Sequence, residues 1–310
     1  MAVVVTGGYG HCGTWIVKKL IEEGKDIIIF NRSERKIDFL EKYSNKIKFF
    51  KGDVQDKTSI LSLFNEHDSE IEGIIHVAGL AGGPEFYKNP LLSININTIG
   101  TLNLLETAKI YGKKKFIYIS SGSVYGERSD IPKESDPVSP SDLYGACKAS
   151  TEFLGLQYAS QYDMDFRAVR IYFAYGPGRM PSELYPLYQA IFGPLQGLRP
   201  NKLDSGRDQE IDFTYVGDVA KAIVAIYMAE HSKYKVYNVA SGTPHKVKDI
   251  IELIKNYTES PLIDEIGSGK SYLRGPSLDI TRISEEFGFK ADYSIENGIR
   301  EYAAWIKANL

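Results

Sequence analysis

Three glycines, each separated from the next by two residues, follow the first apolar run of the chain, in the stretch VVVTGGYGHCGTW. The run Ala2–Thr6 predicts a buried strand, and the residues after the glycines repeat apolar positions near helical spacing. Gly7, Gly10 and Gly13 together allow a tight turn, a close ligand approach and close packing of the helix on the strand. The helix would offer free N–H groups and its positive dipole end to phosphate. This feature predicts a strand–turn–helix unit that binds the phosphates of a dinucleotide.

Strand-like and helical patterns alternate through the first half of the chain. Short runs rich in β-branched and aromatic residues predict strands at Ala2–Thr6, Asp26–Phe30, Ile47–Asp53, Gly73–Gly79, Lys114–Ser121 and Phe166–Phe173. Longer periodic segments between them predict helices, notably Leu91–Tyr111 and Ser141–Gln161. Continuously apolar strands that alternate with helices imply an α/β fold, a doubly wound parallel sheet with right-handed crossovers.

The composition changes after Phe173, where two segments rich in proline and glycine begin. Long irregular segments inside a compact protein are usually functional. We therefore expect a sheet domain over 1–173 and 211–239, and a smaller C-terminal α/β lobe for the substrate over 174–210 and 240–310.

Composition excludes several classes. The 310 residues carry a net charge of −3, so no broad basic surface for nucleic acid is expected. No run of 18 apolar residues occurs and the opening MAVVVTGG has no positively charged segment, so we expect a cytoplasmic protein without a transmembrane helix or signal peptide. The two cysteines, Cys12 and Cys147, lack the neighbours of a zinc site and are interpreted as packing residues, and no metal site is predicted.

The end of the second predicted strand bears on the ribose of the dinucleotide. An Asp or Glu there normally accepts hydrogen bonds from the 2′-hydroxyl. This chain instead has Asn31, followed by Arg32 and Ser33, in FNRSER. A missing carboxylate beside guanidinium groups favours the 2′-phosphate of NADP over NAD, unless the segment is only an exposed basic loop. Asp53, after the third strand, either accepts from the adenine amine or caps the following helix.

Tyr144 and Lys148 are four residues apart in the stretch SPSDLYGACKAS. On the predicted helix they lie one above the other on one face. Such a pair is common by chance, so the two residue types alone leave open a surface or half-buried pair.

Nine stretches occur in the order in which a known family carries them: TGGYGHCG, GDVQD, IIHVAG, NTIGTLNLLETAK, ISSGSVYG, YGACK, YFAYGPG, DFTYVGDVAKAI and YNVASG. Through them the chain resembles an extended short-chain dehydrogenase/reductase of the NAD-dependent epimerase/dehydratase family, which includes UDP-glucose 4-epimerase-like proteins, over nearly its whole length. The resemblance implies a Rossmann-type domain, a bound nicotinamide cofactor and a small C-terminal substrate lobe. It also implies a homodimer paired through the two long helices.

The resemblance also implies roles for single residues. Tyr144 becomes the catalytic acid/base, Lys148 its partner and a ligand of the nicotinamide ribose, and Ser121 the catalytic hydroxyl. Ser123 is expected on the same side of a strand-like path, and Asn97, of the N-x-x-G-T motif, is expected to hold the active-site helix. A free phenol has a pKa of about 10. A nearby ammonium and an oxidised nicotinamide lower that pKa, so Tyr144 can take a proton from a substrate hydroxyl while hydride leaves the same carbon.

The chain departs from the family pattern at the substrate side. Members that dehydrate sugars carry Asp-Glu just after the catalytic hydroxyl, where this chain has Gly122 and Ser123, so that subclass is strongly disfavoured. Members that act on nucleotide sugars usually have Asn in place of Phe173 and Arg in place of Ile211, and both serve the diphosphate.

Other side chains are candidates for the lost contacts. Arg274 matches a further family arginine, and Arg179 and Arg207 could substitute for the lost diphosphate contacts. An alternative for all three is that they are only exposed basic residues on the surface. A group of aromatic residues either lines an apolar pocket or packs in the core: Phe173, Tyr175, Tyr185 and Tyr188.

Three functions remain open. The first is epimerase-type transient oxidation of a sugar or nucleotide sugar, which the overall resemblance favours. The second is a net NADP-dependent dehydrogenase or reductase of a smaller sugar, sugar acid or secondary alcohol, which Asn31, Phe173 and Ile211 favour. The third is a non-catalytic cofactor sensor, which has no need of the Tyr144–Lys148 pair. Epimerase-type chemistry is the prediction.

Overall fold

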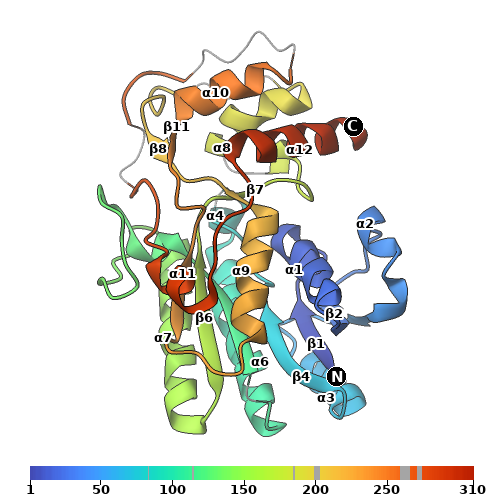
Figure 1. The fold of residues 1–310 in the computed structure, drawn as a ribbon. Coiled ribbons are helices and arrows are strands. Elements are labelled where there is room, and N and C mark those ends of the chain that lie inside the picture. Colours follow the sequence, from blue (N-terminus) through green and yellow to red (C-terminus); the bar gives the residue numbers. More distant parts are fainter. Residues whose placement is uncertain (83, 114, 184–185, 199–202, 259–265, 271–273) are drawn as a thin grey trace.

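The computed structural model describes residues 1–82, 84–113, 115–183, 186–198, 203–258, 266–270 and 274–310. Within them, seven parallel strands form a central sheet in the order β10-β6-β5-β4-β1-β2-β3 (Figure 1). The strands are β1 (Ala2–Thr6), β2 (Asp26–Asn31), β3 (Ile47–Lys51), β4 (Ile71–His76), β5 (Lys115–Ser121), β6 (Asp165–Ile171) and β10 (Val236–Val239). The predicted α/β fold with a doubly wound parallel sheet is confirmed. The strand order reverses between β1 and β4, and such a switch point is where open α/β sheets bind ligands.

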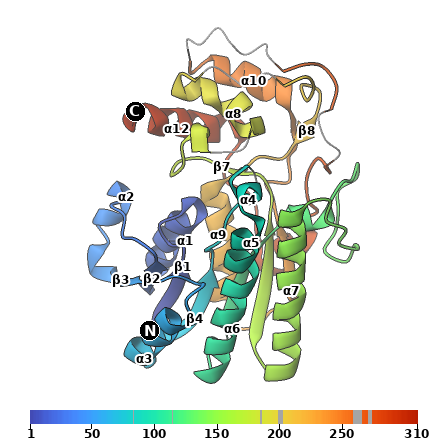
Figure 2. The same ribbon diagram turned by 180° about the vertical axis from the view of Figure 1, so that it is seen from behind.

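Helices cover both faces of this sheet because successive strand residues point to opposite sides. On one face, α1 (His11–Glu22) and α9 (Val216–Met228) pack against each other and, with α11 (Thr281–Phe287), against the strands (Figure 1). On the other face lie α3 (Lys57–His67), α6 (Gly100–Ile110) and α7 (Leu143–Tyr162) (Figure 2). The remaining short helices of this part are α2 (Asp38–Glu41), η1 (Ser44–Lys46), α4 (Pro84–Lys88) and η3 (Gly122–Tyr125).

The helix predicted over Leu91–Tyr111 is not regular. It consists of α5 (Pro90–Ile94), a π-helical turn η2 (Asn95–Ile99) and α6. The wide turn frees backbone carbonyls, and side chains satisfy two of them: Asn97 Nδ2 donates to Ser93 O at 2.9 Å, and Thr101 Oγ1 donates to Asn97 O at 2.7 Å. The prediction of one uninterrupted helix is therefore wrong at this turn.

The second part of the molecule has its own hydrophobic cluster, above the sheet in Figure 1. Its elements are β7 (Ala174–Tyr175), η4 (Pro181–Glu183), α8 (Pro186–Phe192), η5 (Gly193–Gln196), β8 (Glu210–Ile211), β9 (Thr214–Tyr215), β11 (His245–Lys246), α10 (Val247–Lys255) and α12 (Ile295–Ala308). Trp15 of α1 packs against this cluster and against the sheet cluster. Ile211 and Phe213 belong to the second cluster, whereas the predicted boundary assigned them to the sheet domain. The two-domain division stays a prediction.

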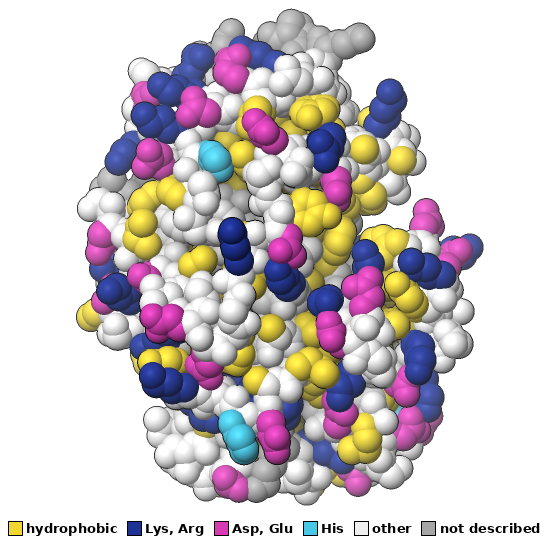
Figure 3. Space-filling view, in the orientation of Figure 1, with side chains coloured by type: hydrophobic (Ala, Val, Ile, Leu, Met, Phe, Trp, Pro, Cys, Tyr) yellow, Lys and Arg dark blue, Asp and Glu magenta, His cyan; other side chains and the backbone are white. Residues whose placement is uncertain are grey.

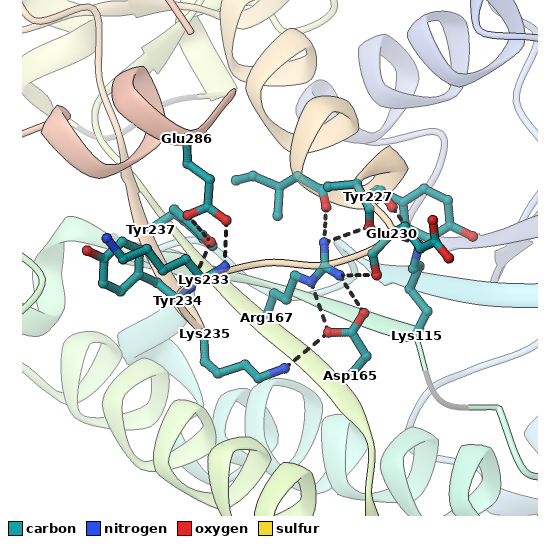
Figure 4. Close-up of polar contacts among 12 residues, drawn as sticks. Lys115, Asp165, Arg167, Tyr227, Glu230, Lys233, Tyr234, Lys235, Tyr237 and Glu286 are labelled. Carbon is teal, nitrogen blue, oxygen red and sulfur yellow. Dashed lines mark hydrogen bonds and ion pairs between the residues drawn. The ribbon is translucent and has the colours of Figure 1, made fainter. Parts of the chain in front are cut away.

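Helix α9 is held by a buried arginine at its C-terminal end (Figure 4). Arg167, in β6, has no exposed surface and donates to the carbonyl groups of Ile226 and Ala229, while Asp165 accepts two further hydrogen bonds from its guanidinium. Carbonyl groups at a helix C-terminus have no partner within the helix, and a cation there also complements the helix dipole. Arg167 therefore fixes α9 to the sheet at the edge far from the carboxyl ends of the strands.

Charges of both signs are interspersed on the face shown in Figure 3, and the surface is hollowed between the upper part and the projection that carries α2. Among the described helices, none has the length and apolar character that crossing a membrane requires.

Candidate active site

The glycine loop has the geometry that a phosphate site requires. Gly7 has φ +67°, and a Cβ at this position would lie 2.8 Å from the backbone of Ala78. A Cβ at Gly13 would lie 2.1 Å from the Gly7 carbonyl oxygen, so only glycine allows the loop to close on α1. Gly10 is the N-cap of α1 and contributes no side-chain cap. The first turn of α1 therefore keeps uncapped N–H groups for an anion.

The two residues predicted at the ribose and adenine end lie at the carboxyl ends of β2 and β3. Asn31 Nδ2 donates to Ser33 O at 3.0 Å, and Arg32 and Ser33 are exposed. Asp53 Oδ1 accepts from the Gln55 N–H at 2.9 Å. The cap of α3 is Asp56, which accepts from the Thr58 N–H at 2.9 Å, so the alternative in which Asp53 caps that helix is wrong. An adenine contact by Asp53 stays a prediction.

Helix α7 begins at Leu143, two residues later than predicted, because Asp142 is its N-cap. Asp142 Oδ1 accepts from the Gly145 N–H at 2.6 Å. This cap places Tyr144 in the first turn, half-buried, with its ring so close to Gly82 that a Cβ there would lie 2.9 Å from Tyr144 Cδ1. The cap therefore fixes the direction in which the phenol enters the site.

Lys148 lies on the same side of α7 as Tyr144. Its Nζ donates to Ile119 O at 2.8 Å and lies 5.9 Å from the centroid of the Tyr144 ring and 5.0 Å from that of the Tyr118 ring. The side chain is buried, and burial lowers its pKa to about 8. Among the described residues the Lys148 ammonium has one hydrogen-bond acceptor, Ile119 O, and it therefore retains N–H donors for a ligand.

Burial raises the pKa of the Tyr144 phenol to about 12, and a hydrogen bond with Ser121 opposes that rise. Ser123 Oγ donates to Ser121 Oγ at 2.9 Å. The expected strand-like path is wrong, because β5 ends at Ser121 and Ser123 belongs to the 3-10 helix η3. The tight turn nevertheless brings the two hydroxyls together, so Ser121, Ser123 and Tyr144 form one polar group at the carboxyl end of β5.

Asn97 belongs to the π-helical turn η2, and its side chain is buried near Lys148. Its Nδ2 donates to Ser93 O, whereas its Oδ1, although buried, has no hydrogen-bond partner among the described residues. A Cβ at Gly79 would lie 2.6 Å from this Oδ1 and 3.8 Å from Lys148 Nζ. Asn97 is thus packed beside Lys148, as expected for a supporting residue.

The candidate substrate arginines are not equivalent. Arg274 forms an ion pair with Asp142 at 2.9 Å and therefore lies at the start of α7. Arg179 follows the loop whose Gly176 carbonyl accepts a hydrogen bond from His11 at 3.1 Å, so it faces the start of α1. The backbone of Arg207 donates to Gly267 O and accepts from the Lys248 N–H, each at 3.0 Å, in the second part of the molecule.

The aromatic candidates divide between pocket and core. Tyr175 and Tyr188 are buried in the second cluster, and Ile211 is buried there too. Phe173 is half-buried, has φ +35° and forms an edge contact with Phe213 at a centroid distance of 5.6 Å. A bulky residue with positive φ is an outlier of the kind that gathers at functional sites. Tyr185 lies outside the described residues.

Sequence reasoning missed two residues of this region, Asp142 and His76. An aspartate three residues before Gly145 at a helix start was an available capping signal. His76 stands at the end of an apolar strand, IIH, and a histidine in so apolar a run signals a buried polar contact.

Known proteins share this architecture. A model of the NAD dependent epimerase/dehydratase family matches residues 3–240. A putative UDP-glucose 4-epimerase of Methanocaldococcus jannaschii is 31% identical, with 99% of each chain covered. A UDP-glucuronate 4-epimerase of Thermodesulfobacterium geofontis is 28% identical, with 99% of this chain and 96% of the relative covered. The crystal structure of a UDP-glucose 4-epimerase with UDP-glucose from Thermotoga maritima is similar with a TM-score of 0.87 at 28% identity, over 100% of this chain and 99% of that one.

The family model covers the glycine loop and helix α7, and the matches to the two relatives also extend over the second part. The chain belongs to the NAD dependent epimerase/dehydratase family, a family of extended short-chain dehydrogenase/reductase enzymes.

Proposed function

We propose that the protein is a nucleotide-sugar epimerase that oxidises a secondary alcohol of its substrate transiently, with Tyr144 as acid/base. The observation that carries this proposal is the meeting of Ser121, Tyr144 and Lys148 at the carboxyl end of β5, on the same edge of the sheet as a glycine loop that leaves a helix N-terminus open. The residue types, their burial and their order on α7 suit proton transfer at a carbon that loses hydride.

Each of the three side chains has a separate task. Tyr144 takes the proton of the substrate hydroxyl, and Ser121 donates a hydrogen bond to the same oxygen. Lys148 favours the phenolate as a nearby cation and offers donors to the cofactor ribose. The bound nicotinamide would supply hydride acceptance and, when oxidised, a positive charge. The pKa of Tyr144 is raised to about 12, chiefly by burial, so formation of the phenolate at neutral pH depends on these cations.

Dehydration is disfavoured by the space at Gly122. A Cβ there would lie 2.6 Å from the Tyr172 ring, so an acidic side chain at this position requires Tyr172 to move. Ser123, at the second position, cannot act as a carboxylic acid. An enzyme that keeps its hydride and returns it needs neither group.

The proposal that the substrate carries a nucleotide is supported by Arg274. Its ion pair with Asp142, the N-cap of α7, holds Arg274 beside the first turn of that helix. Relatives that cover nearly the whole chain are named for UDP-glucose and UDP-glucuronate, which carry a diphosphate. The alternative remains a net NADP-dependent dehydrogenase or reductase of a smaller sugar, sugar acid or alcohol. It is favoured by Ile211, which is buried in the second cluster and offers a diphosphate nothing.

The cofactor is NAD by family, and NADP remains a proposal based on one end of the site. Asn31 provides no carboxylate for a ribose hydroxyl, and Arg32 beside it is exposed. An exposed guanidinium attracts a 2′-phosphate, but salt screens that attraction.

A homodimer is proposed from the apolar surface of two neighbouring helices. Helix α7 packs beside α6 and the π-helical turn, and these elements form one layer in Figure 2. Large exposed apolar residues line this layer: Leu91, Leu92, Ile99, Phe153, Leu154 and Tyr162. A group of exposed large apolar side chains on one layer is typical of a protein–protein interface.

One experiment separates the two reactions. The protein is purified without added nucleotide. One sample is denatured to release and identify any bound cofactor. A second, native sample is assayed with UDP-glucose, UDP-glucuronic acid and free sugar acids in the presence of NAD or NADP. Epimerisation requires retained cofactor and interconversion of a nucleotide sugar without net reduction. An empty protein that reduces added NADP with a free sugar acid, and ignores nucleotide sugars, would establish the alternative.

A further inference from the structure

His76 makes two buried hydrogen bonds at the switch point of the sheet. It is the last residue of β4, and its side chain is 1% exposed. Its Nδ1 lies 2.6 Å from the Oγ1 of Thr6, the last residue of β1, and its Nε2 lies 2.9 Å from the Oγ1 of Thr101 in α6. The imidazole therefore bridges a strand end and a helix start that are far apart in sequence.

The neighbouring hydrogen bonds fix the direction of each proton. Thr101 Oγ1 donates to Asn97 O at 2.7 Å, so its hydrogen is used and it accepts from His76 Nε2–H. Because His76 is neutral, with a pKa of about 3, Nδ1 carries no proton and accepts from the Thr6 hydroxyl. The Ala78 N–H in turn donates to Thr6 Oγ1 at 3.2 Å. The resulting chain of bonds runs from the Ala78 N–H to the Asn97 carbonyl.

The surroundings keep this tautomer. Burial, and then the charge of Lys148, lower the pKa of His76 to about 3. A second proton on His76 would leave Thr6 Oγ1 facing two donors and its own hydrogen without its acceptor. Each polar atom of the chain has its partner only while the imidazole is neutral.

The two ends of this chain are the two parts of the site. At the Thr6 end, Gly7 opens the glycine loop and lies against the backbone of Ala78. At the other end, Asn97 holds the π-helical turn beside Lys148. We propose that His76 is a positioning residue that fixes the spacing between the glycine loop and the Asn97–Lys148 side of the site. This inference rests on the proposed function in one respect, namely that the glycine loop and Lys148 hold the cofactor.

Two substitutions cut the chain on opposite sides of the imidazole. Asparagine reaches only the position of Nδ1, so His76→Asn keeps an acceptor for Thr6 and loses Thr101. Glutamine reaches the position of Nε2, so His76→Gln keeps a donor for Thr101 and loses Thr6. Thr101→Val and Thr6→Val make the same two cuts without touching the histidine. Three quantities are measured. They are the Kd for NADH and for NADPH by fluorescence titration, the kcat for epimerisation of UDP-glucose at saturating cofactor, and the unfolding temperature.

We expect a split between the two pairs. His76→Gln and Thr6→Val should weaken binding of the reduced cofactor that the wild type prefers at least about fivefold more than His76→Asn and Thr101→Val do. The latter two should lose kcat by at least about fivefold more than they lose cofactor affinity. Equal losses of affinity and kcat in all four variants, or lowered unfolding temperature alone, would show that His76 only stabilises the fold.

Failure of the proposed function would look different. A wild type that binds NADH or NADPH but converts no nucleotide sugar removes the epimerase proposal. The binding difference between His76→Gln and His76→Asn still confirms or contradicts the role of His76.

Discussion

Burial shifts the pKa values of Tyr144 and Lys148 in opposite directions, because it disfavours the charged form of each side chain. Burial raises the pKa of the phenol to about 12 and lowers that of the ammonium to about 8. At neutral pH the pair therefore holds a neutral phenol and a cation that loses its charge only a little higher. In the proposed mechanism the charge of Lys148, whose Nζ lies 5.9 Å from the centroid of the Tyr144 ring, favours release of the Tyr144 proton.

In Lys148→Ala the increase of kcat with pH should occur at higher pH than in the wild type. The Tyr144 phenolate loses its neighbouring cation, so the pKa of the phenol rises. The substitution should also weaken cofactor binding, since Lys148 is assigned both tasks. Lys148→Arg, which keeps the charge, is the matched control and should shift the profile less. A pH profile and cofactor affinity that are both unchanged in Lys148→Ala would make Lys148 a structural residue.

Arg274→Ala should raise KM for a nucleotide sugar about tenfold or more, because a charge-assisted bond to the diphosphate is lost. Arg207→Ala is the control, because Arg207 lies in the second part, where its backbone bonds to Gly267 and Lys248. Comparable changes in both variants, or no change in either, would remove Arg274 from the diphosphate site. A free sugar as true substrate would leave KM untouched.

At the scale of elements, the start of α7 decides where the phenol points. Asp142→Ala should cost about 1 kcal/mol of unfolding free energy, because the Gly145 N–H loses its acceptor. Asp142→Asn keeps a capping oxygen and loses only the charge opposite Arg274. Urea unfolding of both variants checks this. If the two variants lose equal stability, the ion pair with Arg274, rather than the cap, is what stabilises the helix start.

The elements that could be predicted from the sequence are those whose local residue pattern determines their structure. The strands and the helix of Tyr144 and Lys148 follow from apolar runs and periodicity, and the glycine loop follows from backbone sterics. The π-helical turn does not, because it depends on Thr101 meeting Asn97 and His76 through the folded sheet. The cap was assigned to Asp53 as one alternative, although Asp56 accepts the helix N–H, because two aspartates three residues apart give the same signal.

The substrate side was the least predictable part. The Arg274–Asp142 pair joins residues that are 132 positions apart in the chain, and no local pattern indicates such a contact. Arg274 was matched to a family arginine and Arg179 and Arg207 were candidates to substitute for it, but the contact of Arg274 with Asp142 is seen only in the folded chain.

At the scale of the whole molecule, buried histidines make stability depend on pH. Burial lowers the pKa of His76 to about 3 and that of His11 to about 4, whereas an unfolded histidine titrates near 6.5. The unfolded chain therefore binds more protons, so stability is present above pH 6.5 and is lost as pH falls below it. The loss approaches about 1.4 kcal/mol per pH unit for each histidine.

Urea unfolding at pH 7 and pH 5 checks this dependence. The difference in unfolding free energy between the two pH values should be smaller in His76→Gln than in the wild type, because one buried titrating group is gone. An equal difference in both proteins would mean that His76 does not contribute to the pH dependence.

The proposed dimer gives a second prediction for the whole molecule. Phe153→Glu places a charge in the middle of the exposed apolar layer and should yield a monomer with unchanged secondary structure. Met228→Glu changes another exposed apolar residue, at the end of α9 outside that layer, and is the control. Sedimentation measures the mass of each. A wild type that is already monomeric, or a Phe153→Glu dimer, contradicts the arrangement.

The central claim is that Tyr144 moves a proton during transient oxidation of a nucleotide sugar. It is tested by incubating wild type and Tyr144→Phe with UDP-glucose and measuring the C4 epimer formed and the nicotinamide absorbance together. The account predicts epimer from the wild type without net accumulation of reduced cofactor, and a loss of about 10²–10⁴-fold in Tyr144→Phe with cofactor binding retained. Epimer formation by Tyr144→Phe within about threefold of the wild type, or net reduction of cofactor with no epimer from the wild type, would contradict it.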